Sequence, residues 1–221
     1  MIVRNWMKRD PVTVTGDTLV SRAERIMTEH NLRALPVADN GRLRGVMTRI
    51  HCMRAAEFVS RTDDPHEFAY YVKRLKVKDV MVRNPSVIDA GDTMEKCLRR
   101  GQDENIGQFP VLEDGNVIGL VSATEVFSLA AHILGVWEDW SGITIGPIVV
   151  GNGTMAKIIE TIVATGARLE SIFAVRSKRG GEETRVIVRF TGADAEAVAG
   201  TVAERGYPVL EICRSTSAAS R

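Results

Sequence analysis

The chain has 221 residues and a mass of 24.3 kDa, which allows one large domain or two of ordinary size. Its residues are 44% hydrophobic and 26% charged, a composition typical of a folded soluble chain and not of a disordered or fibrous one. The 29 Lys and Arg residues and 28 Asp and Glu residues give a net charge of +1, so no overall field attracts nucleic acid or an acidic membrane surface.

Membrane and disulfide signals are also missing from the sequence. No apolar run approaches the roughly 18 to 20 residues of a membrane helix, and residues 1–8 lack the apolar stretch of a signal peptide. We therefore expect a cytoplasmic protein with no membrane partner. Cys52, Cys97 and Cys213 are scattered without CxxC pairing, which argues against a disulfide framework or a zinc site. We expect all three to be buried as small hydrophobic residues.

An internal repeat organises the first part of the chain. The segment MKRDP at 7–11 returns 74 positions later as MVRNP at 81–85. Gly-Asp-Thr follows in both copies, at 16–18 and at 91–93, and the offset of 74 then recovers for a series of Asn, Pro-Val, Gly and hydroxyl positions. Repetition of so many Gly and Pro positions predicts two copies of one structural unit.

Each copy has the same predicted order of elements. After the Gly-Asp-Thr turn, apolar residues at helical spacing predict a helix. Two short strands follow, 35–38 and 43–47 in the first copy and 109–112 and 117–121 in the second. Each pair of strands flanks a turn that ends in Asn-Gly or Asp-Gly, dipeptides that adopt the positive φ angles of a tight hairpin.

A second predicted helix follows each hairpin. Thr48 and Ser122 stand at its start, where a hydroxyl accepts a hydrogen bond from the first unpaired backbone amides. Between the copies, residues 55–76 predict a continuation of the helix after Thr48, a turn at Pro65 and a further helix. We expect the aromatic residues of this further helix to pack at an interface and not to stack on bases.

After Trp140 the pattern changes to that of a separate domain. Strand-like or helix-like spacing is found in turn at 143–150, 155–163, 169–175, 186–190, 195–203 and 209–213. The resulting order, βαββαβ, is the split βαβ plan of ferredoxin-like folds. The fold class expected for the whole chain is therefore α+β.

The repeated segments resemble a known family. The Met-x-x-x-Pro openings, the Pro-Val strands, and the segments GVMTRIH at 45–51 and GLVSATE at 119–125 resemble CBS domains, the modules named after cystathionine β-synthase. Such domains come in tandem pairs that pack sheet to sheet, and the resemblance covers about residues 1–135. The last domain resembles an ACT domain through its element order. A CBS pair followed by an ACT domain resembles the arrangement in bacterial acetoin-utilisation regulatory proteins.

The two resemblances imply a division of the chain into consecutive parts. These parts are CBS repeat 1 at 1–60, a linker helix at 61–76, CBS repeat 2 at 77–135, a connector at 136–142, an ACT-like domain at 143–213 and a tail at 214–221.

The CBS resemblance implies an adenosine-containing regulatory ligand, such as AMP, ADP or ATP, in a cleft between the two repeats. In the family's T-x-x-D motif the hydroxyl contacts ribose or phosphate and the Asp holds the ribose diol, since its two oxygens can accept both hydroxyls. His51 stands at the Asp position of the first copy, and a neutral imidazole has one acceptor nitrogen. Glu125 stands there in the second copy and keeps both oxygens one methylene further out. The second site therefore suits the ligand better.

Further positions follow from the same resemblance. Val87, Phe109 and Pro110 are expected to wedge the base, while Arg33 and Gln108 are expected to face the phosphates. The complete candidate set for nucleotide binding is Val87, Gln108, Phe109, Pro110, Ser122, Thr124, Glu125, Arg33, Thr13, Thr48 and His51.

Simpler roles compete with these assignments. Ser122 and Glu125 also satisfy the capping box, in which the two side chains bond each other's backbone amides without any ligand. Arg33 can equally be a solvated surface residue. His51 shows no metal-ligand spacing with the other histidines, so no metal site is predicted.

The ACT resemblance implies a second ligand turn. Gly151, Asn152 and Gly153 lie where ACT domains place their ligand-binding turn, which implies an amino acid as ligand, although this turn departs from the usual acidic-Pro-Gly type. Coupling between the two sites would pass through residues 126–140. The alternative is a passive connector with buried tryptophans.

No catalytic motif is present: the sequence contains no P-loop, nucleophile elbow or HExxH. The expectation is a non-catalytic nucleotide sensor that requires no cofactor and binds no nucleic acid. The alternative is a structural oligomerisation module whose ligand clefts are degenerate. A homodimer is expected in either case, because CBS pairs stack around a two-fold axis, ACT domains pair edge to edge, and closed two-fold assemblies are the commonest homo-oligomers.

Overall fold

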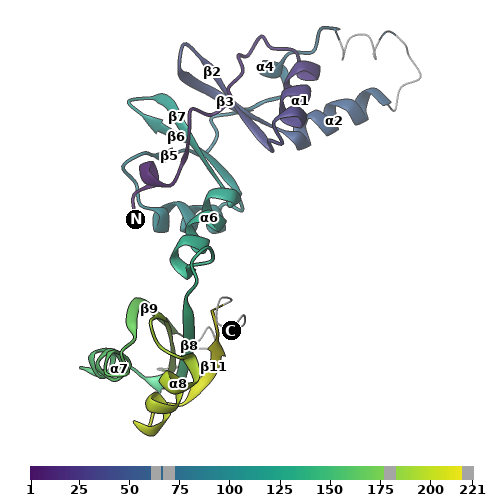
Figure 1. The fold of residues 1–221 in the computed structure, drawn as a ribbon. Coiled ribbons are helices and arrows are strands. Elements are labelled where there is room, and N and C mark those ends of the chain that lie inside the picture. The colour runs from purple at the N-terminus through teal and green to yellow at the C-terminus, as the bar shows by residue number, and fades with distance from the viewer. Residues whose placement is uncertain (61–65, 67–72, 177–182, 216–221) are drawn as a thin grey trace. The chain divides into compact units, whose positions relative to one another are not determined.

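The computed structural model describes residues 1–60, 66, 73–176 and 183–215. The chain divides into two compact units, Met1–Phe127 and Ser128–Arg221. Each unit has its own sheet, accompanied by helices (Figure 1). The mixed α and β composition agrees with the predicted class. No helix in the described part of the chain is both long enough and apolar enough to cross a membrane.

The two copies in the first unit share the order helix, strand, strand, helix, and in the second copy a short strand comes before it. The first copy contains α1 (Val20–Glu29), β2 (Ala34–Asp39), β3 (Arg42–Thr48) and α2 (Arg49–Ser60). The second contains β5 (Ile88–Asp89), α5 (Met94–Asp103), β6 (Gln108–Glu113), β7 (Asn116–Ser122) and α6 (Ala123–Leu134). The segments that open the copies contain η1 (Val3–Asn5) and β1 (Lys8–Arg9), and α4 (Val77–Val80) and β4 (Val82–Arg83).

Both predicted hairpins are confirmed, and so is their turn chemistry. Asn40 and Gly41 have φ angles of 51° and 80°, and Asp114 and Gly115 have φ angles of 50° and 78°. All four residues are therefore in the left-handed region that Asn, Asp and Gly tolerate best. The two hairpins lie side by side in one sheet whose strand order is β2-β3-β7-β6-β5.

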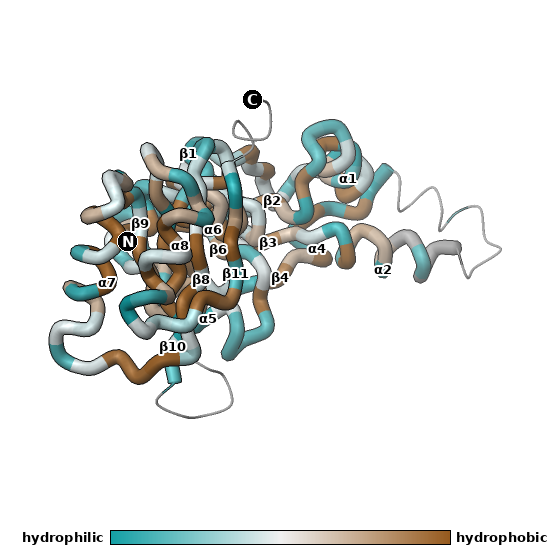
Figure 2. The backbone as a smooth tube through the Cα atoms, turned by 60° about the horizontal axis from the view of Figure 1, so that its bottom comes forward, coloured by the Kyte–Doolittle hydropathy of each residue, from teal (hydrophilic) through white to brown (hydrophobic). Residues whose placement is uncertain are grey.

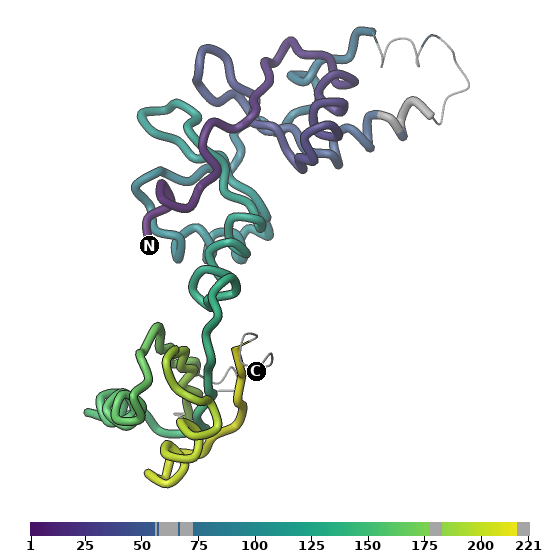
Figure 3. Tube along the Cα trace, in the orientation of Figure 1, coloured from purple at the N-terminus to yellow at the C-terminus, as the bar shows by residue number. Residues whose placement is uncertain are grey.

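The opening segment of each copy lies on the other copy. Val3 is fully buried, its N–H donates to Asp92 O at 2.9 Å, and β1 pairs with β7 so that Lys8 lies opposite Leu120. In the same way β4 pairs with β3. Figure 3 shows the purple N-terminal segment running beside the teal second copy before it enters the first. The two copies thus exchange their opening segments.

Two glycines make this exchange sterically feasible. A Cβ on Gly45 would lie 2.6 Å from Val82 O and 2.7 Å from Met81 Sδ. A Cβ on Gly119 would lie 2.9 Å from Met7 Cγ. The repeated glycines therefore allow the opening segment of the opposite copy to lie directly against the strand.

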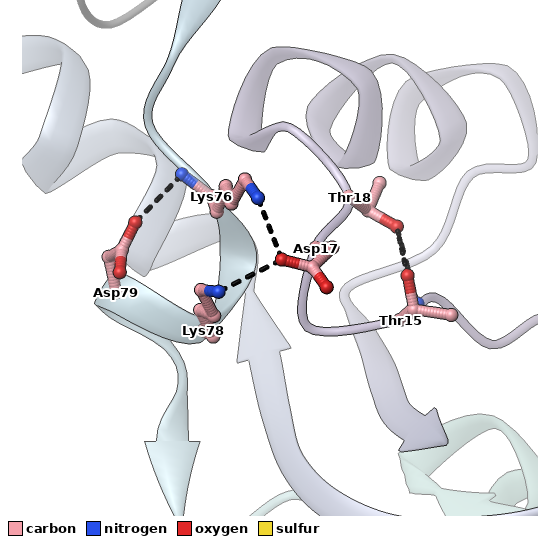
Figure 4. Close-up of polar contacts among 6 residues, drawn as sticks. All are labelled: Thr15, Asp17, Thr18, Lys76, Lys78 and Asp79. Carbon is pink, nitrogen blue, oxygen red and sulfur yellow. Dashed lines mark hydrogen bonds and ion pairs between the residues drawn. The ribbon is translucent and has the colours of Figure 1, made fainter. Parts of the chain in front are cut away.

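Ion pairs join the segment between the copies to the first copy. The Asp17 carboxylate, in the turn before α1, accepts hydrogen bonds from Lys76 Nζ at 2.8 Å and Lys78 Nζ at 2.9 Å (Figure 4). The backbone N–H of Lys76 donates to the Asp79 carboxylate at the start of α4. The hydrogen bonds from Lys76 and Lys78 lower the pKa of Asp17 from 3.8 to about 2.

We expect this pKa shift to be measurable by NMR titration of the Asp17 side-chain carbon. The folded-state pKa lies below the unfolded value, so the carboxylate's contribution to stability is present above pH 3.8 and is lost as the pH falls through about 2. Replacing both Lys76 and Lys78 by Met should return the pKa towards 3.8. Added salt should reduce the shift, because the side chains are exposed. A pKa of 3.8 in the unmodified chain would contradict the assignment.

One sequence-based prediction needs correction, and another falls in part on residues that the structure does not describe. Cys52 and Cys97 are buried as predicted, and burial raises the pKa of the Cys52 thiol to about 11. Cys213 is exposed, because it ends β11 (Val209–Cys213), an edge strand of its sheet. The helix after Thr48 is confirmed as far as Ser60, whereas the predicted turn at Pro65 and the aromatic residues after it lie outside the described residues.

The second unit has the predicted order of elements, βαββαβ. They are β8 (Ser141–Val149), α7 (Thr154–Val163), β9 (Arg168–Arg176), β10 (Glu183–Thr191), α8 (Ala195–Glu204) and β11. The sheet is antiparallel with the order β11-β8-β10-β9. Val186, Val188 and Phe190 alternate along β10 and are fully buried, as the sequence predicted. Much of β8 is coloured as hydrophobic in Figure 2, in agreement with its place inside this sheet.

Candidate functional site

A cavity of about 400 Å³ in the first unit is lined by both copies. The first copy and its opening segments contribute Lys8 and residues 30–34, and the second copy contributes Gln108 and residues 122–125. Five predicted site residues therefore meet here: Arg33, Gln108, Ser122, Thr124 and Glu125.

The start of α6 supplies the acidic side of the cavity. Glu125 Oε2 accepts hydrogen bonds from the Ser122 backbone N–H at 2.7 Å and from Ser122 Oγ at 2.6 Å. The Thr124 N–H donates to Ser122 Oγ at 3.2 Å. The side chains therefore cap the helix, but only half of the predicted capping box is present, because the Ser122 hydroxyl accepts from the Thr124 N–H and not from that of Glu125. Among the described residues, Oε1 of Glu125 has no hydrogen-bond partner, so the carboxylate can still accept a hydroxyl.

The lining of the cavity also contains basic side chains. Lys8 and Arg33 are both exposed, and neither has an ion-pair partner among the residues that the structure describes. His30 lies beside them in the lining. Two such cations in the same lining as a single carboxylate favour a ligand that carries negative charge.

The three residues expected to wedge a base do not line this cavity. Gln108 and Phe109 are neighbours in β6, so their side chains point to opposite faces of the sheet. Gln108 therefore reaches the cavity, whereas Phe109 is 3% exposed and lines a different hollow beside α5. Pro110 is buried, and the Val87 carbonyl accepts a hydrogen bond from Arg100 at 2.7 Å.

Thr48 and His51, the residues of the first copy that correspond to Ser122 and Glu125, do not line the cavity. The Thr48 N–H donates to His51 Nδ1 at 3.1 Å, and the Thr48 hydroxyl lies 2.8 Å from the same nitrogen. The acceptor nitrogen of a neutral imidazole is thereby already used to cap α2. Burial lowers the pKa of His51, and the nearby Arg54 lowers it further, which favours the neutral form. Thr13 is exposed, and it does not line the cavity either.

The predicted ligand turn of the second unit is a compact, exposed loop. Gly153, with a φ of 81°, is the N-cap of α7, and the Gly151 N–H donates to Thr154 Oγ1 at 3.0 Å. Asn152 is exposed. None of the three lines the polar hollow of about 660 Å³ that Lys157 and Tyr207 border in the same unit.

The connector has one exposed and one packed tryptophan. Trp137 is 64% exposed, so the alternative that both tryptophans are buried is wrong for this residue. The His132 ring meets Trp137 edge to face with centroids 5.0 Å apart. Trp140 lies against Gly135, whose φ is 65°.

Metal binding has no structural support in the part of the chain that the structure describes. None of those residues form a group of three or more His, Cys, Asp or Glu side chains that could hold an ion.

Among the titratable residues of the lining, Lys8 and His30 are the two that the sequence analysis did not predict as site residues. Lys8 follows Met7 of the Met-x-x-x-Pro opening and reaches the cavity through the pairing of β1 with β7. The sequence repeat was the one available signal for Lys8, since it marked the two opening segments as equivalent. It did not show that each opening segment pairs with the other copy.

Comparison with known proteins identifies the repeated copies. The family model of the CBS domain matches residues 3–57 and 77–132, together half of the chain. An inosine-5'-monophosphate dehydrogenase from Korarchaeum cryptofilum is 28% identical over 173 residues, which cover 76% of this chain and 33% of that protein. The chain therefore spans only a third of the length of this relative.

Solved structures share the fold of the first unit. A protein from Vibrio cholerae assigned to acetoin utilization (AcuB) has a TM-score of 0.54 and 18% identity, covering 62% of this chain and 96% of its own. The structure of CBSX2 in complex with AMP has a TM-score of 0.51 and 23% identity, covering 60% of this chain and 98% of its own.

Proposed function

The chain belongs to the CBS-domain family, and we propose that it is a non-catalytic regulatory protein that senses an adenine nucleotide in the cavity between its two repeats. The observation that carries the proposal is the distribution of charge in that cavity. A helix-capping carboxylate stands on the second repeat, and two cations that have no ion-pair partner among the described residues, Lys8 and Arg33, stand in the same lining.

The ribose and the phosphates of a nucleotide each have a matching group in this arrangement. Glu125 Oε1 accepts from the ribose hydroxyls, while Lys8 and Arg33 pair with phosphate oxygens. The backbone amides at the start of α6 add a favourable partial positive charge for the anion. The AMP complex of CBSX2 supports an adenosyl ligand for this fold.

Isothermal titration with AMP, ADP and ATP tests the proposal directly. We expect saturable binding of at least one of them with one strong site per chain, and weaker binding at 0.5 M salt because exposed cations are screened. Absence of binding to all three, at protein concentrations that detect millimolar affinity, would contradict the proposal. It would favour the alternative of a structural oligomerisation module with degenerate ligand clefts. That alternative is supported by the capping roles of His51 and Glu125, which need no ligand.

We further propose that the second unit is an ACT-like domain with a ferredoxin-like plan, and that its turn at Gly151 to Gly153 is the place for an amino acid. The βαββαβ order and the antiparallel sheet support the fold assignment. We also propose that the protein is located in the cytoplasm.

We expect the protein to be a homodimer, since both kinds of domain commonly pair around two-fold axes. Light scattering of the full chain should therefore give about twice the mass of 24.3 kDa at micromolar concentration. A mass near 24.3 kDa over the same range would exclude the dimer.

A further inference from the structure

The second repeat contains a hollow that the first repeat fills. This cavity, of about 280 Å³, is lined by α5, α6 and the adjoining strands of the second repeat alone. Its deepest lining residues are almost fully buried: Cys97 is 2% exposed, Phe109 3% and Val121 1%.

The first cause of the hollow is a difference at one pair of equivalent positions. Met27 and Gly101 are 74 residues apart, the offset of the repeat. Each carbonyl accepts a hydrogen bond from the N–H five residues later, Leu32 N–H at 2.8 Å and Ile106 N–H at 2.9 Å, so the two positions are equivalent. The Met27 side chain is 1% exposed and belongs to the core of the first repeat. Gly101 has no side chain, and a Cβ there would lie 3.0 Å from Ile106 O and 3.5 Å from the ring of Phe109. The space that Met27 occupies is thus left open in the second repeat.

The second cause is a difference at another pair of equivalent positions. The Arg49 N–H donates to Arg33 O at 3.1 Å, and the Ala123 N–H donates to the equivalent carbonyl, Gly107 O, at 3.2 Å. The Arg49 guanidinium then donates to Leu32 O at 2.7 Å and Met27 O at 3.1 Å, so its side chain covers the end of α1. Ala123 has no side chain that could reach the end of α5, and it lines the cavity.

The walls of the hollow define what it can hold. Leu98, Ile106, Val126 and Phe127 make them apolar, and Gln102 provides an amide at the rim. Leu98 is 38% exposed and Phe127 is 74% exposed, so large apolar side chains stand at its edge. An apolar cavity of about 150 Å³ is enough to take a benzene molecule, and water gains few hydrogen bonds in such a place.

We propose that this cavity is a second ligand site, which binds a small uncharged molecule with an aromatic or branched aliphatic body and one polar substituent. The body lies against Phe109 and Val121, and the substituent meets Gln102 at the rim. Cys97 and Gly101 line only the apolar cavity, whereas Gly107, Ser122, Ala123 and Phe127 line both cavities, so the two sites are neighbours. The proposal rests on the residues that line the apolar cavity alone.

The test is an NMR titration of the full chain with p-cresol, which has an aromatic body and one hydroxyl. We expect saturable amide shifts confined to α5, α6 and β6, with a dissociation constant on the order of 1 mM or tighter. Gly101→Met reproduces the side chain of the first repeat, and we expect it to weaken p-cresol binding at least about tenfold. Gly101→Ala fills less of the hollow and should give an intermediate loss.

Gly200→Ala is the matched control. Gly200 also lies within a helix, α8, and a Cβ there meets no atom within 4 Å. Both substitutions raise helix propensity, but only the one at Gly101 fills the cavity. The control should therefore bind p-cresol like the unmodified chain. AMP titration of Gly101→Met should be unchanged, which separates this site from the nucleotide site.

Three results would overturn the proposal. The first is a set of shifts that do not saturate or that spread over the whole chain. The second is equal affinity of the unmodified chain and Gly101→Met for p-cresol. The third is absence of p-cresol binding together with a lower molecular mass for Gly101→Met, which would mean that a side chain of a second copy occupies the hollow.

Discussion

Glu125→Ala is expected to weaken AMP binding about tenfold or more, because it removes a charged hydrogen-bond acceptor from the ribose. Isothermal titration of the unmodified chain and the variant measures the change. The carboxylate also caps α6 through two hydrogen bonds from Ser122, so the substitution is expected to reduce stability by about 1 kcal/mol as well. The two effects need separate readouts.

His51→Ala provides the matched control for this prediction. His51 caps α2 through Thr48 as Glu125 caps α6 through Ser122, but it does not line the nucleotide cavity. We expect a comparable loss of stability and unchanged AMP affinity. If Glu125→Ala bound AMP as tightly as the unmodified chain, Glu125 would be a helix cap only and the ribose would have to be held elsewhere.

Gly45→Ala is expected to destabilise the first unit by about 1 to 3 kcal/mol, the usual range for forcing an extra group into a closely packed position. The added Cβ would lie 2.6 Å from the backbone oxygen of Val82, which cannot move without breaking the pairing of β4 with β3. Urea unfolding followed by circular dichroism measures the loss.

Gly107→Ala is the control for Gly45→Ala. A Cβ on Gly107 meets no atom within 4 Å, and its φ is not in the left-handed region. We expect a change of no more than about 0.5 kcal/mol, as for ordinary surface positions. Equal stability of Gly45→Ala and the unmodified chain would mean that the exchanged segments can separate from the sheet at little cost.

Local features of the fold could be predicted because local chemistry determines them. The Asn40-Gly41 and Asp114-Gly115 turns fix both hairpins, and the alternation of Val186, Val188 and Phe190 fixes the buried face of β10. The exchange of opening segments could not be predicted in this way. It depends on which strand a two-residue segment such as Lys8–Arg9 pairs with, and nothing within that segment distinguishes one repeat from the other.

The site was predicted in part for the same reason. Ser122, Thr124 and Glu125 form a short motif whose spacing is visible in the sequence, and the structure brings them together with Arg33 and Gln108. Lys8 could not be predicted because it arrives by the exchange. The base-wedge residues were chosen by family resemblance, and strand alternation sends Phe109 to the opposite face from Gln108.

The crossing of β1 and β4 also bears on the origin of the first unit. Two separate single-repeat chains, each lending its opening strand to the other, would make the same two strand pairings that β1 and β4 make here. The unit is therefore equivalent to a domain-swapped dimer encoded on one chain. Two identical chains must share every substitution, whereas duplicated repeats accept them one at a time. Because both repeats lie on one chain, one half can carry Met27 while the other carries Gly101, a difference that two identical chains could not have.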